Sequence, residues 1–96
     1  MNSNLLQEKR KNKIMLDTAI GPIIRIIDGN SFQMQVTHIG RHNVYAYGNF
    51  ETVYIAPNPN AKNSTPLSIA LIGRRVKCQV RYRDNYNRLF SDVEFE

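Results

Sequence analysis

The distribution of apolar and polar positions indicates extended chain from residue 22 onward. Residues 22–27 (PIIRII) form a continuous β-branched run, which suits a strand that is buried on both faces for part of its length. The Asp-Gly-Asn sequence at 28–30 is a strong turn signal, because glycine and asparagine tolerate positive φ angles. Residues 31–38 then alternate between apolar and polar side chains, so the two segments predict a β-hairpin. The apolar positions on its inner face are Phe32, Met34 and Val36.

The middle of the chain predicts a third extended region and a short helix. The extended region covers residues 43–55, with an interruption near Gly48. Prolines and asparagines in residues 57–63 indicate an irregular loop. A hydroxyl residue at 64 or 65 followed by Pro66 is typical of a helix start, and Gly73 ends this helix after about two turns.

The last part of the chain predicts a second hairpin with a defined register. Residues 75–82 and 89–96 both alternate between apolar and polar side chains. Pairing Tyr82 with Leu89 places Val80, Cys78 and Val76 opposite Ser91, Val93 and Phe95 on one face, and Gln79, Lys77 and Arg75 opposite Asp92, Glu94 and Glu96 on the other. A slip of one residue would invert every side chain, so this register alone satisfies both faces.

The order of these elements predicts the fold class. Three strands, a short helix and a two-stranded hairpin are the order of a five-stranded OB-type Greek-key barrel, whose helix plugs the barrel between strands 3 and 4. We therefore expect an all-β domain with one short helix over residues 14–96. Residues 1–13 are expected to form an N-terminal basic arm that is flexible, and a short amphipathic helix using Leu5 and Leu6 is the alternative.

Composition narrows the class of protein. Thirteen Lys and Arg against eight Asp and Glu give a net charge of +5, which fits a polyanion-binding protein and equally a soluble basic protein. Cys78 is the one cysteine, so the chain has no internal disulfide, and its apolar neighbours at i±2 predict a core position. Without a recognisable secretory or membrane-spanning run, we expect a cytoplasmic protein with no membrane association.

Three segments in order resemble staphylococcal-nuclease-like (thermonuclease) domains. Residues 24–32 (IRIIDGNSF) are similar to the family's first hairpin, whose turn usually reads D-G-D-T. Residues 51–62 (ETVYIAPNPNAK) resemble its third strand and active-site loop, commonly V-R-L-x-x-I-D-A-P-E. Residues 72–95 (IGRRVKCQVRYRDNYNRLFSDVEF) resemble its G-K-x-V-x-V and D-x-Y-G-R-x-x-A-x-V segment. The resemblance covers residues 22–96 and implies the OB-type barrel.

The resemblance also implies that the active site is degenerate. The family's chemistry needs a calcium ion held by carboxylates, a glutamate base and two arginines. The metal ligands correspond to Asn30 and Pro59, the base to Lys62, the first arginine to Tyr54, and the second arginine is kept as Arg88. Between Glu51 and Asp84 there is no Asp or Glu, so no small shift of the alignment restores these groups. Loss of a general base removes about 10²- to 10⁴-fold of rate. We therefore expect no catalytic residues, no metal, no cofactor and no small-molecule substrate.

Basic residues interleaved with aromatic ones predict a binding face instead. OB barrels hold single strands with a basic groove and base-stacking rings. The residues expected to line this face and bind single-stranded DNA or RNA are Arg41, Tyr54, Lys62, Arg83, Tyr86 and Arg88. His38 and His42 lie four apart on extended chain, which does not favour a metal site.

The alternative is a protein-interaction or structural module of a larger assembly, or a homo-oligomer, without nucleic-acid contact. Tyrosines commonly serve packing in small barrels. Arg75 and Lys77 are expected to be neutralised across the strand by Glu96 and Glu94, which shrinks the basic stripe. An uncovered barrel flank would then be the partner surface. Salt distinguishes the two hypotheses, because nucleic-acid binding weakens steeply with ionic strength.

Overall fold

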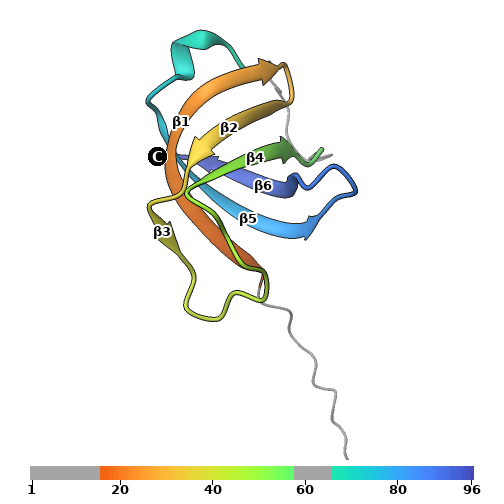
Figure 1. Cartoon of the computed structure of the whole chain (residues 1–96). Helices are drawn as coiled ribbons and strands as arrows, with labels where there is room; N and C mark the ends of the chain where they lie inside the picture. Colours follow the sequence, from red (N-terminus) through yellow and green to blue (C-terminus); the bar gives the residue numbers. More distant parts are fainter. Residues whose placement is uncertain (1–15, 58–65) are drawn as a thin grey trace, which may run out of the picture.

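The strands predicted from the alternating pattern close into a barrel (Figure 1). The computed structural model describes residues 16–57 and 66–96, so the predicted arm and Lys62 lie outside the described residues. The elements are β1 (Asp17–Asp28), β2 (Ser31–Gln35), β3 (His38–Ile39), β4 (Phe50–Ile55), the 3₁₀ turn η1 (Ile69–Leu71), β5 (Arg75–Arg83) and β6 (Leu89–Phe95).

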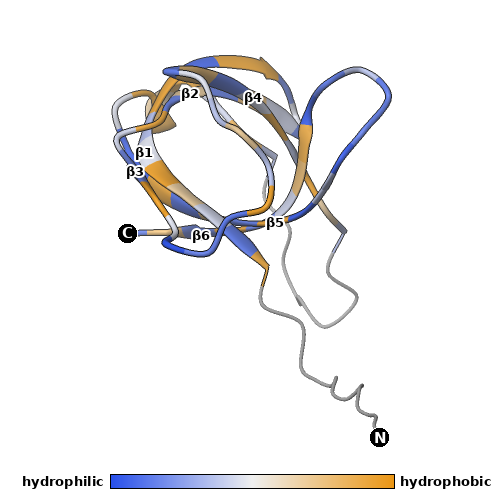
Figure 2. Cartoon of the chain, turned by 60° about the horizontal axis from the view of Figure 1, so that its bottom comes forward, coloured by the Kyte–Doolittle hydropathy of each residue, from blue (hydrophilic) through white to orange (hydrophobic). Residues whose placement is uncertain are grey.

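Five strands form the closed ring and β3 is added at its side. β1 pairs antiparallel with both β2 and β5, β2 pairs with β4, β5 pairs with β6, and the ring is closed by a parallel pairing of β4 with β6. Figure 2 looks into this ring, in which the neighbours follow the order β1-β2-β4-β6-β5. β1 is long enough to pair with two strands of the ring: its first half pairs with β5 and its second half pairs with β2. The all-β barrel expected from the sequence is therefore confirmed.

Gly21 lies where β1 passes from one partner to the other. A β-carbon at this position would overlap the carbonyl oxygen of Gln35, so β1 and the end of β2 can approach only around glycine. The Ile20 carbonyl oxygen accepts a hydrogen bond of 2.8 Å from the Thr37 amide in the same place. β1 continues through Gly21 and Pro22 and begins at Asp17, earlier than the residue-22 start that the sequence predicted, because its first half pairs with β5.

Inward-facing side chains of every ring strand form one core. The buried members are Ile23, Phe32, Met34, Val53, Leu67, Val76, Cys78, Val80 and Leu89. The predicted core position of Cys78 is confirmed, and burial raises the pKa of its thiol to about 12. The first hairpin is confirmed as well, with the Asp28 carboxylate accepting hydrogen bonds from the Asn30 amide and the Ser31 hydroxyl in the turn.

The register of the β5–β6 hairpin is confirmed from Val76–Phe95 to Val80–Ser91 and is wrong beyond it. A β-bulge at Arg81 adds one residue to β5, so Tyr82 lies opposite Phe90 and Arg83 opposite Leu89. An extra residue on one strand exchanges the faces of all that follow. Tyr82 therefore points outward, and Arg83 points toward the end of the barrel interior.

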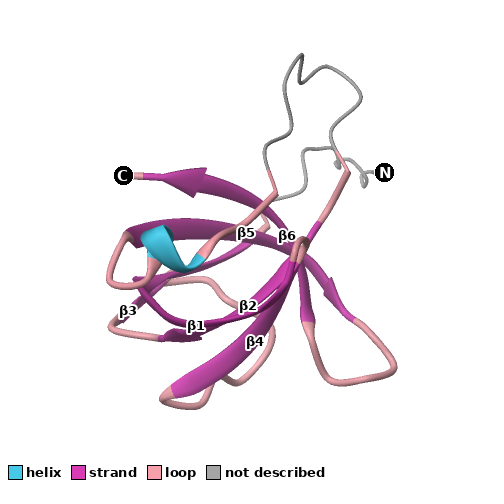
Figure 3. Ribbon diagram, turned by 90° about the horizontal axis from the view of Figure 1, so that it is seen from above, coloured by secondary structure: helices cyan, strands magenta, loops and turns pink. Residues whose placement is uncertain are grey.

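The predicted two-turn helix is wrong in length: only the 3₁₀ turn η1 is present in residues 66–73 (Figure 3). Ser68 is extended, and the Leu67 amide donates to the Gly29 carbonyl oxygen instead of starting a helix. None of the three η1 residues is buried, so the turn does not plug the barrel as predicted. The neighbouring Leu67 is buried in the core instead.

The third extended region is shorter than predicted. Only 50–55 forms a strand, and residues 40–49 form a loop that returns across the start of β1 (Figure 1). Backbone amides of this loop bond to the Asp17 carboxylate, while the side chain of Asn43 donates to and accepts from the backbone of Thr18. The backbone of this loop is thus bonded to side chains rather than to a neighbouring strand. The sequence of residues 43–47 did not indicate this.

Candidate nucleic-acid interface

Three aromatic side chains lie side by side on the outer face of β4, β6 and β5. Tyr54 is the register partner of Phe90, which is in turn the partner of Tyr82. The ring centroids are 5.8 Å apart for Tyr54–Phe90 and 4.9 Å for Tyr82–Phe90, with interplanar angles of 14° and 20°. Parallel rings at these distances are favourable aromatic pairs. The bulge in β5 is what aligns Tyr82 with the other two rings.

Two arginines and a fourth ring extend this row. The guanidinium carbon of Arg88 lies 4.7 Å from the ring centre of Tyr54 and 5.0 Å from that of Tyr86, so the cation is placed between two rings. The guanidinium of Arg81 lies 5.8 Å from the ring centre of Phe90. All three distances are within the range of cation–π attraction. We call this surface the arginine–aromatic ladder; its members are Tyr54, Arg81, Tyr82, Tyr86, Arg88 and Phe90.

Both ladder arginines have a carboxylate partner. Arg88 donates from Nε to Asp84 at 2.8 Å, and Arg81 donates from Nη2 and Nε to the two carboxylate oxygens of Asp92 at 2.7 and 3.2 Å. Asp84 also accepts the amides of Tyr86 and Arg88. Burial opposes ionisation of Asp84, but these bonds hold its pKa below the ordinary value. The pKa of Arg81 is raised, chiefly by its bonds to Asp92.

Asp84 also shapes the turn that carries Arg88 and Tyr86. The Asp84 amide donates to the Arg88 carbonyl oxygen and the Asn87 amide donates to the Asp84 carbonyl oxygen. Asn87 has a φ of 63°, a left-handed conformation that asparagine tolerates better than most residues. The sequence D-N-Y-N-R therefore folds into a tight turn that places Arg88 between Tyr86 and Tyr54 of β4.

Arg83 does not lie in the ladder. Its guanidinium donates to Glu51 at 3.0 Å and to the Ala46 carbonyl oxygen at 2.8 Å, and it lies over the rings of Tyr45 and Tyr47. Only 18% of the Arg83 side chain and 9% of the Glu51 side chain are exposed. The expectation that Arg83 shares a face with Arg88 is thus corrected, because the bulge turns Arg83 toward the barrel end.

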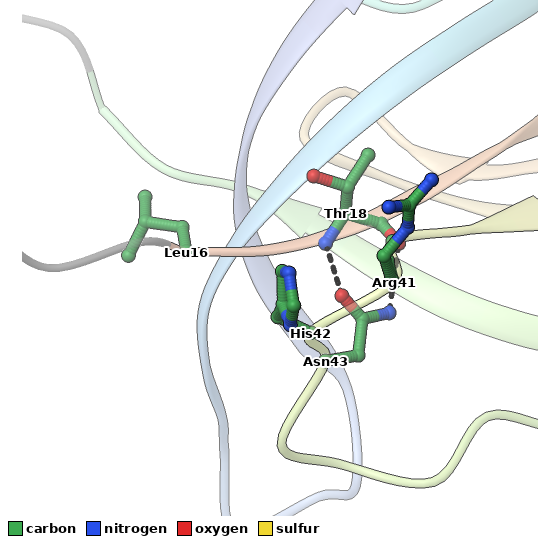
Figure 4. A pocket seen from close by; sticks show the side chains of 6 residues that line it. Leu16, Thr18, Arg41, His42 and Asn43 are labelled. Carbon is green, nitrogen blue, oxygen red and sulfur yellow. Dashed lines mark hydrogen bonds between the residues drawn. The ribbon is translucent and has the colours of Figure 1, made fainter.

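Arg41 is also placed elsewhere. It lies in the loop after β3 and lines a shallow depression together with Leu16, Thr18 and His42 (Figure 4). None of the residues that line this depression belongs to the ladder. Of the six residues predicted for the interface, the structure brings together Tyr54, Tyr86 and Arg88, places Arg41 at a separate depression, and does not describe Lys62. Arg83 points toward the barrel end, where it bonds to Glu51 and also to Asn87 of the turn.

Sequence reasoning missed a buried carboxylate that anchors the loop of residues 40–49. Asp17 is 5% exposed and accepts hydrogen bonds from the amides of Val44 and Tyr45 and from the Tyr47 hydroxyl, at 2.8 to 3.0 Å. Burial raises the pKa of Asp17, but the bonds from Tyr45, Val44 and Tyr47 outweigh it and the pKa is lowered. Burial and the neighbouring Asp17 raise the pKa of Tyr47. A single Asp between Leu16 and Thr18 carried no recognisable signal for this role.

Charge is distributed unevenly along the chain. Residues 16–57 and 66–96 contain eight Lys and Arg and seven Asp and Glu, so the described barrel is close to neutral. Most of the net charge of +5 therefore comes from residues 1–15 and from Lys62. The candidate interface on the barrel is therefore aromatic rather than strongly basic.

Other chemistry is sparse in the described part of the chain. No cluster of three or more His, Cys, Asp and Glu side chains suited to a metal ion occurs within residues 16–57 and 66–96. His38 is exposed and its Nδ1 lies 2.9 Å from the Thr37 hydroxyl and 3.0 Å from Arg75. In these same segments, no helix has the length and apolar character needed to span a bilayer. No family model, curated protein or solved structure matches the chain.

Proposed function

We propose that this chain is a non-catalytic binding barrel of the OB type, which holds single-stranded DNA or RNA on the arginine–aromatic ladder. The strand order β1-β2-β4-β6-β5, with β4 parallel to β6, supports the OB-type Greek-key assignment. The three segments that resemble staphylococcal-nuclease-like domains support it independently. The proposed location is the cytoplasm.

The ladder is the observation that carries the proposal. Base stacking on an aromatic side chain is worth about 1 to 3 kcal/mol per base, and every base has a π-face to offer. The ring faces inside the row are occupied by one another, so the free faces are those at its ends. Tyr86 is 78% exposed and Tyr82 is 46% exposed, which leaves both available to a base. Arg88, held between Tyr54 and Tyr86, is placed to meet a phosphate.

The lack of carboxylates supports the non-catalytic part of the proposal. No Asp or Glu occurs between Glu51 and Asp84, where the resembled family has its metal ligand and base. Glu51 itself is engaged by Arg83 and by the Gly48 amide. Asp84 and Asp92 are likewise held in ion pairs, with Arg88 and Arg81 respectively.

A second candidate, binding of a protein partner, is favoured by apolar exposure at the other end of β1. Ile24 and Ile27 on β1 are 36% and 43% exposed, and Ile69 and Ile72 around η1 are 79% and 49% exposed. β1 and η1 are in contact with each other. An apolar contact of this kind would be insensitive to salt.

Fluorescence anisotropy with labelled single-stranded DNA and RNA tests the proposal. We expect binding by the wild-type chain, and Tyr86→Ala should weaken it about 5- to 150-fold because one stack is lost. Tyr45→Ala is the matched control, since Tyr45 is also an exposed tyrosine beside an arginine, but that arginine is Arg83, which lies outside the ladder. Equal effects of the two substitutions would contradict the proposal.

The basic residues near the N-terminus need their own control. A variant in which Lys9, Arg10, Lys11 and Lys13 are replaced by Gln loses four positive charges outside the described barrel. Measured at about 50 and 200 mM salt, it should bind with a shallower salt dependence yet keep its sensitivity to Tyr86→Ala. If that variant loses all binding, the ladder is not the interface.

A further inference from the structure

The two ladder arginines are paired with their carboxylates in different ways. Arg88 uses only Nε on Asp84, and Asp84 accepts two backbone amides of its own turn as well. Asp84 is therefore part of the turn and orients Arg88. Arg81 uses two nitrogens on the two oxygens of Asp92, the parallel arrangement with which arginine binds a phosphate.

Asp92 has no comparable structural role. Within the described residues its side chain bonds to Arg81 alone, and the two side chains are each 41% exposed. Exposed pairs of this kind contribute about 0 to 1 kcal/mol to stability. The carboxylate thus occupies the donor pair of Arg81 and makes no other side-chain bond among the described residues.

Neutralisation changes which ligands the ladder can attract. With Arg88 matched by Asp84 and Arg81 by Asp92, the row has no net charge. A duplex exposes its phosphates, while its base faces are buried within the stack. Attraction between phosphate and positive charge is therefore the main interaction that a duplex could make with this surface. Unpaired bases can still stack on exposed rings. A repulsive or neutralising group that penalises the wrong ligand is a common way to obtain specificity.

We infer that Asp92 is a specificity-determining residue: by occupying Arg81 beside the ring of Phe90, it keeps the ladder selective for unpaired bases over duplex phosphates. This inference rests on the proposed function. It goes further in assigning the selectivity to one carboxylate and in placing Arg81, rather than the inward-facing Arg83, at the interface.

The test compares Asp92→Asn with Glu94→Gln in the full-length chain. Both remove one negative charge from the outer face of β6, but Glu94 lies opposite Lys77, away from the rings. The probes are a labelled dT oligonucleotide and the corresponding dA·dT duplex, titrated at about 50 and 200 mM salt. Urea unfolding of each variant confirms that the fold is retained.

Asp92→Asn should raise duplex affinity several-fold at the lower salt and steepen the slope of log K against log salt by about 0.9 on duplex and about 0.7 on single strand, as expected for one new phosphate contact. Glu94→Gln should leave both affinities near wild type. Adding Arg81→Gln to Asp92→Asn restores neutrality and should return the wild-type selectivity.

Equal gains in Asp92→Asn and Glu94→Gln would attribute the effect to overall charge and overturn the inference. Unchanged duplex affinity in the Asp92→Asn variant would also overturn the inference. In either case, binding of the single strand by the wild-type chain would still support the proposed function. A wild-type chain that does not bind the dT oligonucleotide would overturn both.

Discussion

Replacement of Asp17 by Asn tests whether a buried carboxylate holds the loop of residues 40–49 on the barrel. The two oxygens of Asp17 accept the amides of Val44 and Tyr45 and the hydroxyl of Tyr47. An asparagine keeps one acceptor and presents an NH₂ group where the second oxygen was. At least one loop donor then faces another donor in a site that is only 5% exposed.

The magnitude follows from these contacts. A buried donor left without a partner costs about 1 to 3 kcal/mol, and bonds to a charged acceptor contribute about 1.5 to 3 kcal/mol each. We expect Asp17→Asn to lower the free energy of unfolding by about 2 to 4 kcal/mol. Because m is about 1 to 3 kcal/mol/M in urea for small proteins, the midpoint should fall by about 0.7 to 4 M.

Urea unfolding followed by tyrosine fluorescence and circular dichroism measures this, since the chain has five tyrosines and no tryptophan. Asp92→Asn is the matched control and should cost at most about 1 kcal/mol, because its ion pair is exposed. A fall of less than about 0.5 kcal/mol for Asp17→Asn would refute the reasoning.

The wild-type chain and Asp17→Asn also test how the contribution of Asp17 to stability depends on pH. The pKa of Asp17 is lowered in the folded state, so its contribution is complete above the unfolded-chain value of about 3.9 and is lost as pH falls through the folded-state pKa. The stability difference between wild type and Asp17→Asn should therefore be constant near neutral pH and shrink below about pH 4. A difference that grows on acidification would contradict this assignment.

Three further predictions concern the barrel itself. Gly21→Ala should destabilise by about 1 to 3 kcal/mol in urea unfolding, because its β-carbon overlaps the Gln35 carbonyl, and a neutral result would contradict that close approach. Cys78 should resist Ellman's reagent in the native state and react as urea unfolds the chain, since burial raises its pKa to about 12; immediate reaction would place it at the surface. Glu51→Gln should cost about 1 to 3 kcal/mol because Arg83 loses its charged partner at the barrel end, whereas an unchanged urea midpoint would show that the Arg83–Glu51 ion pair does not stabilise the fold.

The strands and most of their register could be predicted because a strand with one face on the core alternates between apolar and polar side chains. Val76, Cys78 and Val80 face the core as expected from period-two spacing. The alternation of β5 runs on through Tyr82 without a break, so nothing in the pattern marks the bulge at Arg81. A bulge is decided by how the strand must twist to close the barrel, which is a property of the whole sheet.

The candidate site was predictable only in part, for the same reason. Tyr86 and Arg88 were recognisable because they share one short turn with Asp84, so their proximity follows from the local sequence. Arg83 was misplaced because the bulge reverses its face. Phe90 escaped the predicted set, although its alternation with the core residue Leu89 already indicated an outward position on β6. The loop contacts of Asp17 join residues more than 25 positions apart, and no local pattern encodes them.

The most direct test of the central claim is a map of backbone amide chemical shifts during titration of the ¹⁵N-labelled chain with a short dT oligonucleotide. If the arginine–aromatic ladder binds single strands, the largest shifts should fall on Tyr54, Tyr82, Tyr86, Arg88 and Phe90. Residues 40–43 around Arg41 should shift little, since they line a separate depression. Shifts confined to those residues or to Ile24, Ile27, Ile69 and Ile72, or no shifts at saturating oligonucleotide, would contradict the proposed interface.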